Sequence, residues 1–307
     1  MSRLAADPAS PALDPTLSFE PNVAIGDALN AIHAMFERSA VRAISIDLEP
    51  KSALAPQLAR MGVIHDLSSA PTGRITARSS RATFFQRAEP WLVGASSAAF
   101  PLRFVMSQGK RHPERPPIPP GVVYRRRIPA IDGIVTLRTI TIDGDLDVFH
   151  RWMNDPRVAA FWELSGSREL HAEYLERTLA DRHVHPVVGC FDGNPFGYFE
   201  IYWAKEDRIA PFYDADDYDR GIHMLVGEPR YRGPHRVEAW LPSLVHYLFL
   251  DDPRTKNVVA EPRSDNAKMI DYLTRAGFCK TKEFDFPHKR AALMVASREV
   301  FFGERCP

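Results

Sequence analysis

The fold is decided by a stretch that reads Asp219-Arg-Gly-Ile-His-Met-Leu-Val-Gly-Glu-Pro-Arg-Tyr-Arg-Gly-Pro-His235. Its apolar first part predicts a short strand, and the turn after it leads into an apolar helix. The first backbone N–H groups of a helix have no partner within the helix. The turn adds the guanidinium groups of Arg230 and Arg232, and Gly233 lets the backbone approach a ligand closely. Together these features predict a site for an anion.

The sequence downstream supports this interpretation. The helix after the turn is expected to bury one face against a sheet, because apolar residues recur at helical spacing: Val237, Trp240, Leu241, Leu244, Val245 and Leu248. Pro242 inside it predicts a kink. A strand over 258–261 follows, and then a helix that begins at Asn266 and ends before Gly277. An arginine- and glycine-rich loop before a helix is common, so the anion site depends on both halves of the pattern.

Composition excludes several classes of partner. The 307 residues carry 39 Lys and Arg against 39 Asp and Glu, which gives no electrostatic reason to expect nucleic acid or an anionic membrane. No apolar run approaches the roughly 20 residues of a membrane span, and no signal-peptide core is visible. The three cysteines lack metal-ligand spacing, and the pair His183 and His185 has no third ligand nearby. We therefore expect a cytoplasmic protein with reduced thiols and no metal.

Proline content suggests how the chain divides. Residues 107–120 contain five prolines and no apolar period, which predicts a stiff exposed linker. We place this linker at 111–121, between an N-terminal accessory α+β domain over 1–110 and a main domain over 122–307. A proline-rich recognition motif is the alternative interpretation.

The sequence of the accessory domain contains few patterns that predict secondary structure or function. Residues 28–36 have helical spacing, whereas 41–48 and 82–85 are typical of strands. No group of residues there indicates catalysis, and the sequence leaves the role of this domain open.

The main domain gives a denser pattern. Strands are expected over 122–127 and 134–139, joined by a turn at Asp132 and Gly133, and a second hairpin over 187–203. Helices and strands alternate through the centre, whereas both ends are hairpin-like. This order predicts a fold of the α/β (α+β) class, with a mixed, mostly antiparallel sheet flanked by helices.

These residues resemble the GNAT acetyltransferases, whose pyrophosphate turn and following asparagine-led helix form an acyl-CoA site. Arg230, Gly233 and His235 occupy the main turn positions, and His235 departs from the Gly or Ala of the family. Asn266 and the Gly277-Phe278 pair match without change. The resemblance implies the GNAT fold and acetyl-CoA or another acyl-CoA as co-substrate. It assigns to that co-substrate Leu225, Val226, Arg230, Arg232, Gly233, His235 and Asn266.

A closer resemblance covers nearly all of 122–302. Four strings carry it: His150-Arg-Trp-Met-Asn-Asp-Pro-Arg-Val158, Phe196-Gly-Tyr-Phe-Glu-Ile-Tyr-Trp-Ala-Lys-Glu-Asp207, Asp219-Arg-Gly-Ile-His223 and Glu261-Pro-Arg-Ser-Asp-Asn266. They are similar to the siderophore-biosynthesis acyltransferases that act on hydroxylysine or hydroxyornithine. The resemblance implies N-acylation of a side-chain hydroxylamine for iron acquisition, alongside other enzymes of such a pathway.

Acyl transfer requires a proton acceptor and a donor for the developing oxyanion. His223 has a suitable ordinary pKa, and the resemblance favours it as general base, although a lone histidine in an apolar strand is more often a core residue. Asp265 is the candidate to orient His223, with helix capping as an equally weighted role, and Glu261 is the substitute. The oxyanion donor is expected to be a backbone N–H of Leu225 or Val226.

The acceptor amino acid needs acidic groups, a cation and aromatic walls. The candidates are Glu200, Tyr202, Trp203, Lys205 and Asp207 at the end of one strand, with His150 and Trp162 from the first helical region. A strand end with solvated charges is the plain alternative.

Two other functions stay open at this stage. One is a GNAT enzyme that acylates an ordinary amine of an aminoglycoside or a protein, and the other is a non-catalytic acyl-CoA-binding module. The sequence fixes neither the acyl group nor the length of the acceptor.

Overall fold

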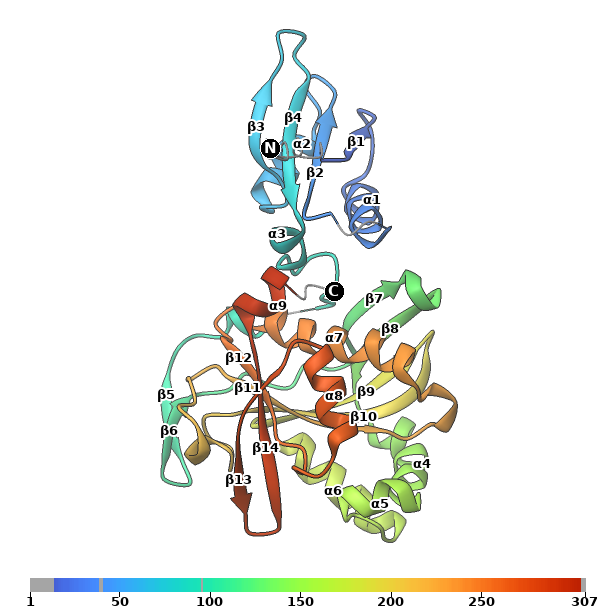
Figure 1. Ribbon diagram of the computed structural model, residues 1–307, viewed down its shortest axis with the longest axis vertical. Helices are drawn as coiled ribbons and strands as arrows, with labels where there is room; N and C mark the ends of the chain where they lie inside the picture. The colour runs from blue at the N-terminus through green and yellow to red at the C-terminus, as the bar shows by residue number, and fades with distance from the viewer. Residues whose placement is uncertain (1–13, 39–40, 95, 305–307) are drawn as a thin grey trace, which may run out of the picture. The chain divides into compact units, whose positions relative to one another are not determined.

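The computed structural model describes residues 14–38, 41–94 and 96–304, and the chain forms two compact units, Met1–Pro90 and Trp91–Pro307 (Figure 1). The division therefore falls before the proline-rich segment that the sequence singled out as a linker. That segment belongs to the second unit because Arg115 is buried there: it is 3% exposed and binds Glu206 through Nε and Nη2 at 2.7 and 2.6 Å. Lys110–Pro113 forms strand β6, which pairs with β5 (Phe104–Ser107).

The first unit is a four-stranded sheet with helices. Its elements are β1 (Thr16–Phe19), α1 (Ile25–Arg38), β2 (Ala43–Leu48), α2 (Leu54–Arg60), β3 (His65–Ser69), β4 (Ile75–Ser80) and α3 (Arg81–Phe85), with the strands in the order β1-β2-β4-β3. The sequence-based assignment of 82–85 as a strand is wrong. Ser80 caps a helix there by accepting a hydrogen bond from the Thr83 N–H, which outweighs the strand preference of the aromatic residues.

The second unit contains an eight-stranded sheet in the order β13-β14-β12-β11-β10-β9-β8-β7. Its strands are β7 (Val122–Ile128), β8 (Gly133–Thr139), β9 (Val184–Phe191), β10 (Asn194–Trp203), β11 (Arg220–Val226), β12 (Asn257–Ala260), β13 (Cys279–Phe286) and β14 (Lys289–Ser297). Every neighbouring pair is antiparallel except β11 and β12. The mixed, mostly antiparallel sheet predicted from the sequence is confirmed.

Helices cover both faces of this sheet. They are α4 (Ile142–Met153), α5 (Pro156–Trp162), α6 (Arg168–Ala180), α7 (Pro234–Asp251), α8 (Ala267–Arg275) and α9 (Arg298–Glu304). On one face, the Trp240 ring of α7 stacks on Phe199 at 5.1 Å. On the other, Phe149 of α4 contacts Tyr198 edge-on at 4.9 Å. Because successive strand residues point to opposite faces, Phe199 and Tyr198 anchor different layers.

The α7 helix continues through Pro242.

Among the described helices, none is long and apolar enough to cross a lipid bilayer.

Candidate active site

A cleft of about 1220 Å³ opens where β11 and β12 separate. The two strands pair only at Arg220↔Val258 and Gly221↔Val259, although β11 continues to Val226. The Asp219 carbonyl accepts from the Ala204 N–H at 2.9 Å, on the β10 side. Backbone groups of a strand alternate in direction, so the amides of residues 222, 224 and 226 face the gap instead. The separated strands therefore offer backbone donors to a ligand. Of the two amides named from the sequence, that of Val226 faces the gap, whereas that of Leu225 faces β10.

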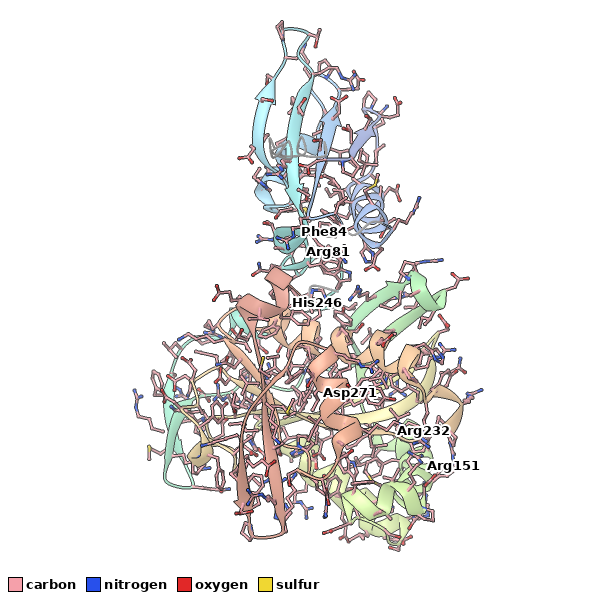
Figure 2. The ribbon with its side chains drawn as sticks, viewed as in Figure 1. Arg81, Phe84, Arg151, Arg232, His246 and Asp271 are labelled. Atoms are coloured by element: carbon pink, nitrogen blue, oxygen red, sulfur yellow. The ribbon has the colours of Figure 1, made fainter. Side chains whose placement is uncertain are left out.

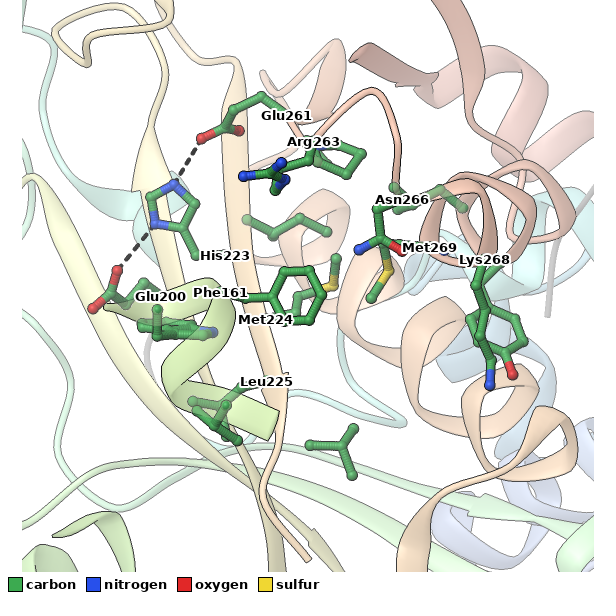
Figure 3. Close-up of a pocket in the computed structure, with 18 of the residues that line it drawn as sticks. Phe161, Glu200, His223, Met224, Leu225, Glu261, Arg263, Asn266, Lys268 and Met269 are labelled. Atoms are coloured by element: carbon green, nitrogen blue, oxygen red, sulfur yellow. Dashed lines mark hydrogen bonds and ion pairs between the residues drawn. The ribbon is translucent and has the colours of Figure 1, made fainter. Parts of the chain in front are cut away.

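His223 projects from β11 between two carboxylates (Figure 3). Its Nδ1 lies 3.0 Å from Glu200 Oε2, and its Nε2 lies 2.8 Å from Glu261 Oε1. Glu200 stands directly opposite His223 in the β10–β11 register, and Glu261 follows the last residue of β12. Both ring nitrogens approach acceptors, so the geometry is that of an imidazolium. We call Glu200, His223 and Glu261 the carboxylate–histidine unit.

Three tyrosines hold the two carboxylates in place. The Tyr174 and Tyr198 hydroxyls both donate to Glu200 Oε1, the second at 3.0 Å. The Tyr202 hydroxyl donates to Glu261 Oε2 at 2.6 Å. The carboxylates are almost fully buried, with side-chain exposures of 9% and 1%, whereas His223 is 27% exposed. The imidazolium is thus the member of the unit that a bound molecule can touch.

The electrostatics of the unit favour charge separation. Burial lowers the pKa of His223, but Glu261 and Glu200 outweigh it and raise this pKa to about 10. Burial also raises the pKa of Glu261, yet the imidazolium outweighs it and holds this pKa at about 2. The pKa of Glu200 is lowered in the same way, against burial, by His223 and the tyrosine hydroxyls. At neutral pH the unit therefore carries one positive and two negative charges.

The opposite half of the cleft, which we call the cofactor half, lies at the N-termini of α7 and α8. Gly233 precedes α7 with φ of 121°, a backbone conformation that side chains rarely adopt. Asn266 caps α8 by accepting from the Met269 N–H at 3.1 Å. Arg232 and Lys268 add positive charge to the lining (Figures 2 and 3). Two helix ends and two cations suit the phosphates of a nucleotide-type ligand.

Three residues that the sequence assigned to the site lie outside the cleft lining. The Arg230 guanidinium lies over the Tyr231 ring, 4.8 Å from its centroid. The His235 imidazole packs against Gly233, where an added Cβ would lie 3.2 Å from its Cε1. Asp265 is exposed and binds Arg263 Nη2 at 2.9 Å, whereas Glu261, the substitute named from the sequence, lies 2.8 Å from His223 Nε2.

Of the residues that the sequence proposed for acceptor binding, some line the cleft and others lie outside it. Glu200, Asp207 and Trp162 line the cleft, together with Leu225 and Val226, and Tyr202 contributes by holding Glu261. The others point elsewhere. The Trp203 ring stacks under the buried Arg220 guanidinium at 3.9 Å, Lys205 Nζ binds the Ala215 carbonyl at 2.7 Å, and His150 Nδ1 lies 2.8 Å from His171 Nδ1.

Sequence reasoning missed several lining residues. They are Arg157, Phe161, Tyr174, Arg208, Lys268 and Lys289. Phe161 is 60% exposed although it lines the cleft, and Figure 3 shows its ring between His223 and α8. An exposed aromatic side chain at the end of a short helix leaves no periodic signal in the sequence, and the cations come from loops whose position depends on the finished sheet. Within the described ranges, no group of His, Cys, Asp and Glu could hold a metal ion.

Comparison with known proteins agrees with this architecture. The family model described as an acetyltransferase (GNAT) domain matches residues 141–286. The N(6)-hydroxylysine O-acetyltransferase of Escherichia coli is 47% identical over 215 residues, which cover 70% of this chain and 68% of that enzyme. The chain belongs to the GNAT acetyltransferase family. Its second unit has the GNAT fold.

Fungal relatives are longer than this chain. An N(5)-hydroxyornithine:cis-anhydromevalonyl coenzyme A-N(5)-transacylase of Beauveria bassiana is 48% identical over 219 residues, which cover 70% of this chain and 48% of that protein. A hydroxyornithine transacylase of Ajellomyces capsulatus is 41% identical over 251 residues, covering 73% and 57%. The match thus spans about half of the fungal relatives' length and about two thirds of the bacterial one.

Solved structures share the fold of the second unit. A protein from Bacillus halodurans aligns with a TM-score of 0.56 at 33% identity, covering 61% of this chain and 94% of that one. The aminoglycoside acetyltransferase AAC(6')-Ib in complex with coenzyme A aligns with a TM-score of 0.51 at 27% identity, covering 56% and 99%.

Proposed function

We propose that this chain transfers an acyl group from acyl-CoA to the side-chain hydroxylamine of an N-hydroxylated diamino acid, such as N6-hydroxylysine or N5-hydroxyornithine. The product is a hydroxamate, a ligand for ferric iron, and we assign the reaction to hydroxamate siderophore biosynthesis in the cytoplasm, where acyl-CoA is formed. Relatives named for hydroxylysine and hydroxyornithine support the acceptor class.

The observation that carries the proposal is the geometry of the carboxylate–histidine unit, in which the two nitrogens of His223 lie 3.0 and 2.8 Å from oxygens of Glu200 and Glu261. With the pKa of His223 raised to about 10 and that of Glu261 held at about 2, the cleft lining near the reaction centre holds only weak bases at neutral pH. An alkyl ammonium group would have to lose a proton before it could attack a thioester. A hydroxylamine is far less basic and arrives neutral, so weak bases suffice.

The reaction balances with the residues present. The hydroxylamine nitrogen attacks the thioester carbonyl carbon, the new N–C bond forms, and the C–S bond breaks with its electron pair on sulfur. The nitrogen becomes acidic as it bonds, and its proton passes to a carboxylate of the carboxylate–histidine unit, Glu261 or Glu200, because both nitrogens of the imidazolium already carry hydrogens. The unit changes from a net charge of −1 to neutral, which burial favours. The CoA thiolate takes a proton from solvent.

The developing oxyanion needs a donor fixed before the reaction. The Val226 amide faces the gap between β11 and β12, and Arg157 holds the end of this strand by donating to the Val226 carbonyl at 2.8 Å. We assign the donor role to that amide, while the cofactor half binds the pyrophosphate of acyl-CoA.

The test is thiol release from acetyl-CoA with N6-hydroxylysine, N5-hydroxyornithine, lysine and ornithine side by side. We expect the hydroxylated acceptors to react faster than the plain ones by about 10⁴ at neutral pH, because the plain amine is charged and leaves the hydroxyl partner unpaired. Raising the pH should recover part of the deficit. Equal rates would remove the hydroxylamine assignment and leave the acyltransferase assignment standing.

A further inference from the structure

Two cations line the cleft beside the carboxylate–histidine unit and take no part in its proton chemistry. Arg208 Nη2 lies 3.8 Å from Glu261 Oε1, the oxygen that also lies 2.8 Å from His223 Nε2. Lys289 Nζ donates to the main-chain carbonyl of Glu261 at 2.7 Å, which leaves it two further N–H groups. Among the described residues, Arg208 makes that single ion pair and no hydrogen bond. Both side chains therefore keep donors that a bound molecule can use.

Both cations lie near the same aromatic ring, that of Phe286. The Arg208 guanidinium and the Lys289 ammonium lie 5.1 and 5.6 Å from the centroid of Phe286. Phe286 is buried, 5.1 Å from the Phe212 ring. The ring face attracts cations, so the pair is ordered before any ligand binds, which reduces the entropic cost of binding.

The segment before β7 fixes the loop that carries Arg208. Lys110 Nζ donates to the carbonyls of Glu206 and Asp207 at 2.9 and 2.5 Å. Arg115 binds the Glu206 carboxylate through two parallel hydrogen bonds at 2.7 and 2.6 Å. The proline-rich stretch thus anchors the two residues that precede Arg208 in the chain.

The residues joined to Glu261 by hydrogen bonds and ion pairs carry one excess positive charge: Glu200 and Glu261 are negative, whereas His223, Arg208 and Lys289 are positive. Two further acidic residues of the lining, Asp207 and Glu163, lie outside this group, and Asp207 Oδ2 lies 3.3 Å from His183 Nε2. Arg263 is neutralised separately by Asp265. Burial, and with it the nearby Arg208, lowers the pKa of Lys289 despite the opposing Glu261, and a bound anion would relieve this unfavourable environment.

We infer that Arg208 and Lys289 form a subsite for the α-carboxylate of the acceptor, so that the enzyme acts on the free amino acid and discriminates against decarboxylated amines. This inference rests on the proposed function. It replaces Lys205, whose ammonium group binds the Ala215 carbonyl, as the acceptor-binding cation. If the carboxylate must be free during acylation, any condensation at that carboxyl group follows the acylation step.

The experiment compares three acceptors that share the hydroxylamine: N6-hydroxylysine, its α-carboxamide, and the decarboxylated N-hydroxy-1,5-diaminopentane. For the wild-type enzyme we expect kcat/KM to fall by about 10²-fold when the carboxylate is absent, because two charge-assisted contacts are lost. Arg208→Gln and Lys289→Met should each raise KM for hydroxylysine about tenfold. On the carboxamide each variant should lose less kcat/KM than on hydroxylysine, and that smaller loss reports the contacts of the two side chains with Glu261.

Arg290→Gln is the matched control, because Arg290 is the exposed neighbour of Lys289 and binds Glu283 and Asp285 outside the cleft. An unchanged thermal shift with acetyl-CoA verifies that each variant is folded and keeps the cofactor half. Equal use of all three acceptors by the wild type, or equal losses on all three in the variants, overturns the inference while the proposed function stands. Failure of the wild type to acylate any of the three hydroxylamines would instead reject the proposed function.

Discussion

The two halves of the cleft present different chemical groups to a ligand: the cofactor half presents mainly backbone groups, and the acceptor half presents side chains. The cofactor half uses backbone, namely the N-termini of α7 and α8, a glycine with positive φ, and the unpaired amides of β11. The acceptor half, comprising Glu200, His223, Glu261, Arg208 and Lys289, uses side chains from strands, a loop and a hairpin. A backbone site tolerates most side-chain changes but not a change of backbone shape. A side-chain site should respond strongly to the loss of single charges.

The largest effect is expected in the acceptor half. Glu261→Gln keeps the shape of the side chain but removes the negative charge that lets the carboxylate–histidine unit accept a proton. We expect kcat to fall by roughly 10²–10⁴ with little change in acetyl-CoA affinity. The matched variant is Asp265→Asn, four residues later, where the carboxylate is exposed and binds only Arg263 among the described residues. Steady-state kinetics of both variants make the test, and comparable losses in the two would return Asp265 to the catalytic group.

Backbone shape in the cofactor half gives the next largest effect. Gly233→Glu introduces a side chain at φ of 121° and a negative charge where the pyrophosphate is expected. Acetyl-CoA at 100 times its Kd stabilises the wild type by about 2.7 kcal/mol, and this thermal shift should vanish in the variant. Gly193→Glu controls for strain, since Gly193 also has positive φ, of 80°, in the turn between β9 and β10. A normal shift in the Gly233 variant would remove the turn from the cofactor site.

The pH dependence distinguishes a charged His223 from an ordinary one. Because the pKa of His223 is raised to about 10, the charge of the carboxylate–histidine unit does not change between pH 6.5 and 9, and we expect kcat to stay level over that range. A rise through pH 6.5 in kcat would show an unperturbed histidine acting as base.

The same shifts predict how stability depends on pH. The raised pKa of His223 gives a stabilising contribution that is complete below its ordinary value of 6.5 and is lost as the pH rises through about 10. The lowered pKa of Glu261 gives a contribution that is present above its ordinary 4.5 and is lost as the pH falls through about 2. Denaturant titrations of wild type and His223→Gln across this range test the contribution, which should be absent from the variant.

The smallest expected effect is a difference in acetyl-CoA affinity between variants of two arginines in the same turn. Arg232 lines the cleft, whereas Arg230 lies over Tyr231. Losing one charge-assisted phosphate contact should raise the Kd of acetyl-CoA about tenfold in Arg232→Gln, and Arg230→Gln should change it less than about threefold. Calorimetric titration measures both constants, and the reverse order would show that the turn rearranges when the cofactor binds.

The same contrast explains what could be predicted from the sequence. The fold and the cofactor half depend on local patterns, so the turn with Arg232 and Gly233 was predicted from the residues, and the resemblance to the GNAT family added Asn266. The same reasoning also named Arg230 and His235, which lie outside the cleft lining. The acceptor half is assembled by strand register, which could not be predicted from the sequence. Glu200 contacts His223 only because the two residues are paired in the β10–β11 register. Asp265 was favoured over Glu261 as the orienting residue because sequence proximity to a helix cap is visible, whereas side-chain direction past the end of β12 is not.

The most direct measurement of the central claim is the identity of the product. Wild-type enzyme would be mixed with one equivalent of acetyl-CoA and N6-hydroxylysine, and released thiol and ferric-complex absorbance would be followed together. We predict a ferric hydroxamate that forms in the same amount as free thiol, because the nitrogen is the atom acylated. Thiol release without a ferric hydroxamate would show acylation at oxygen or at another group, and would contradict the account.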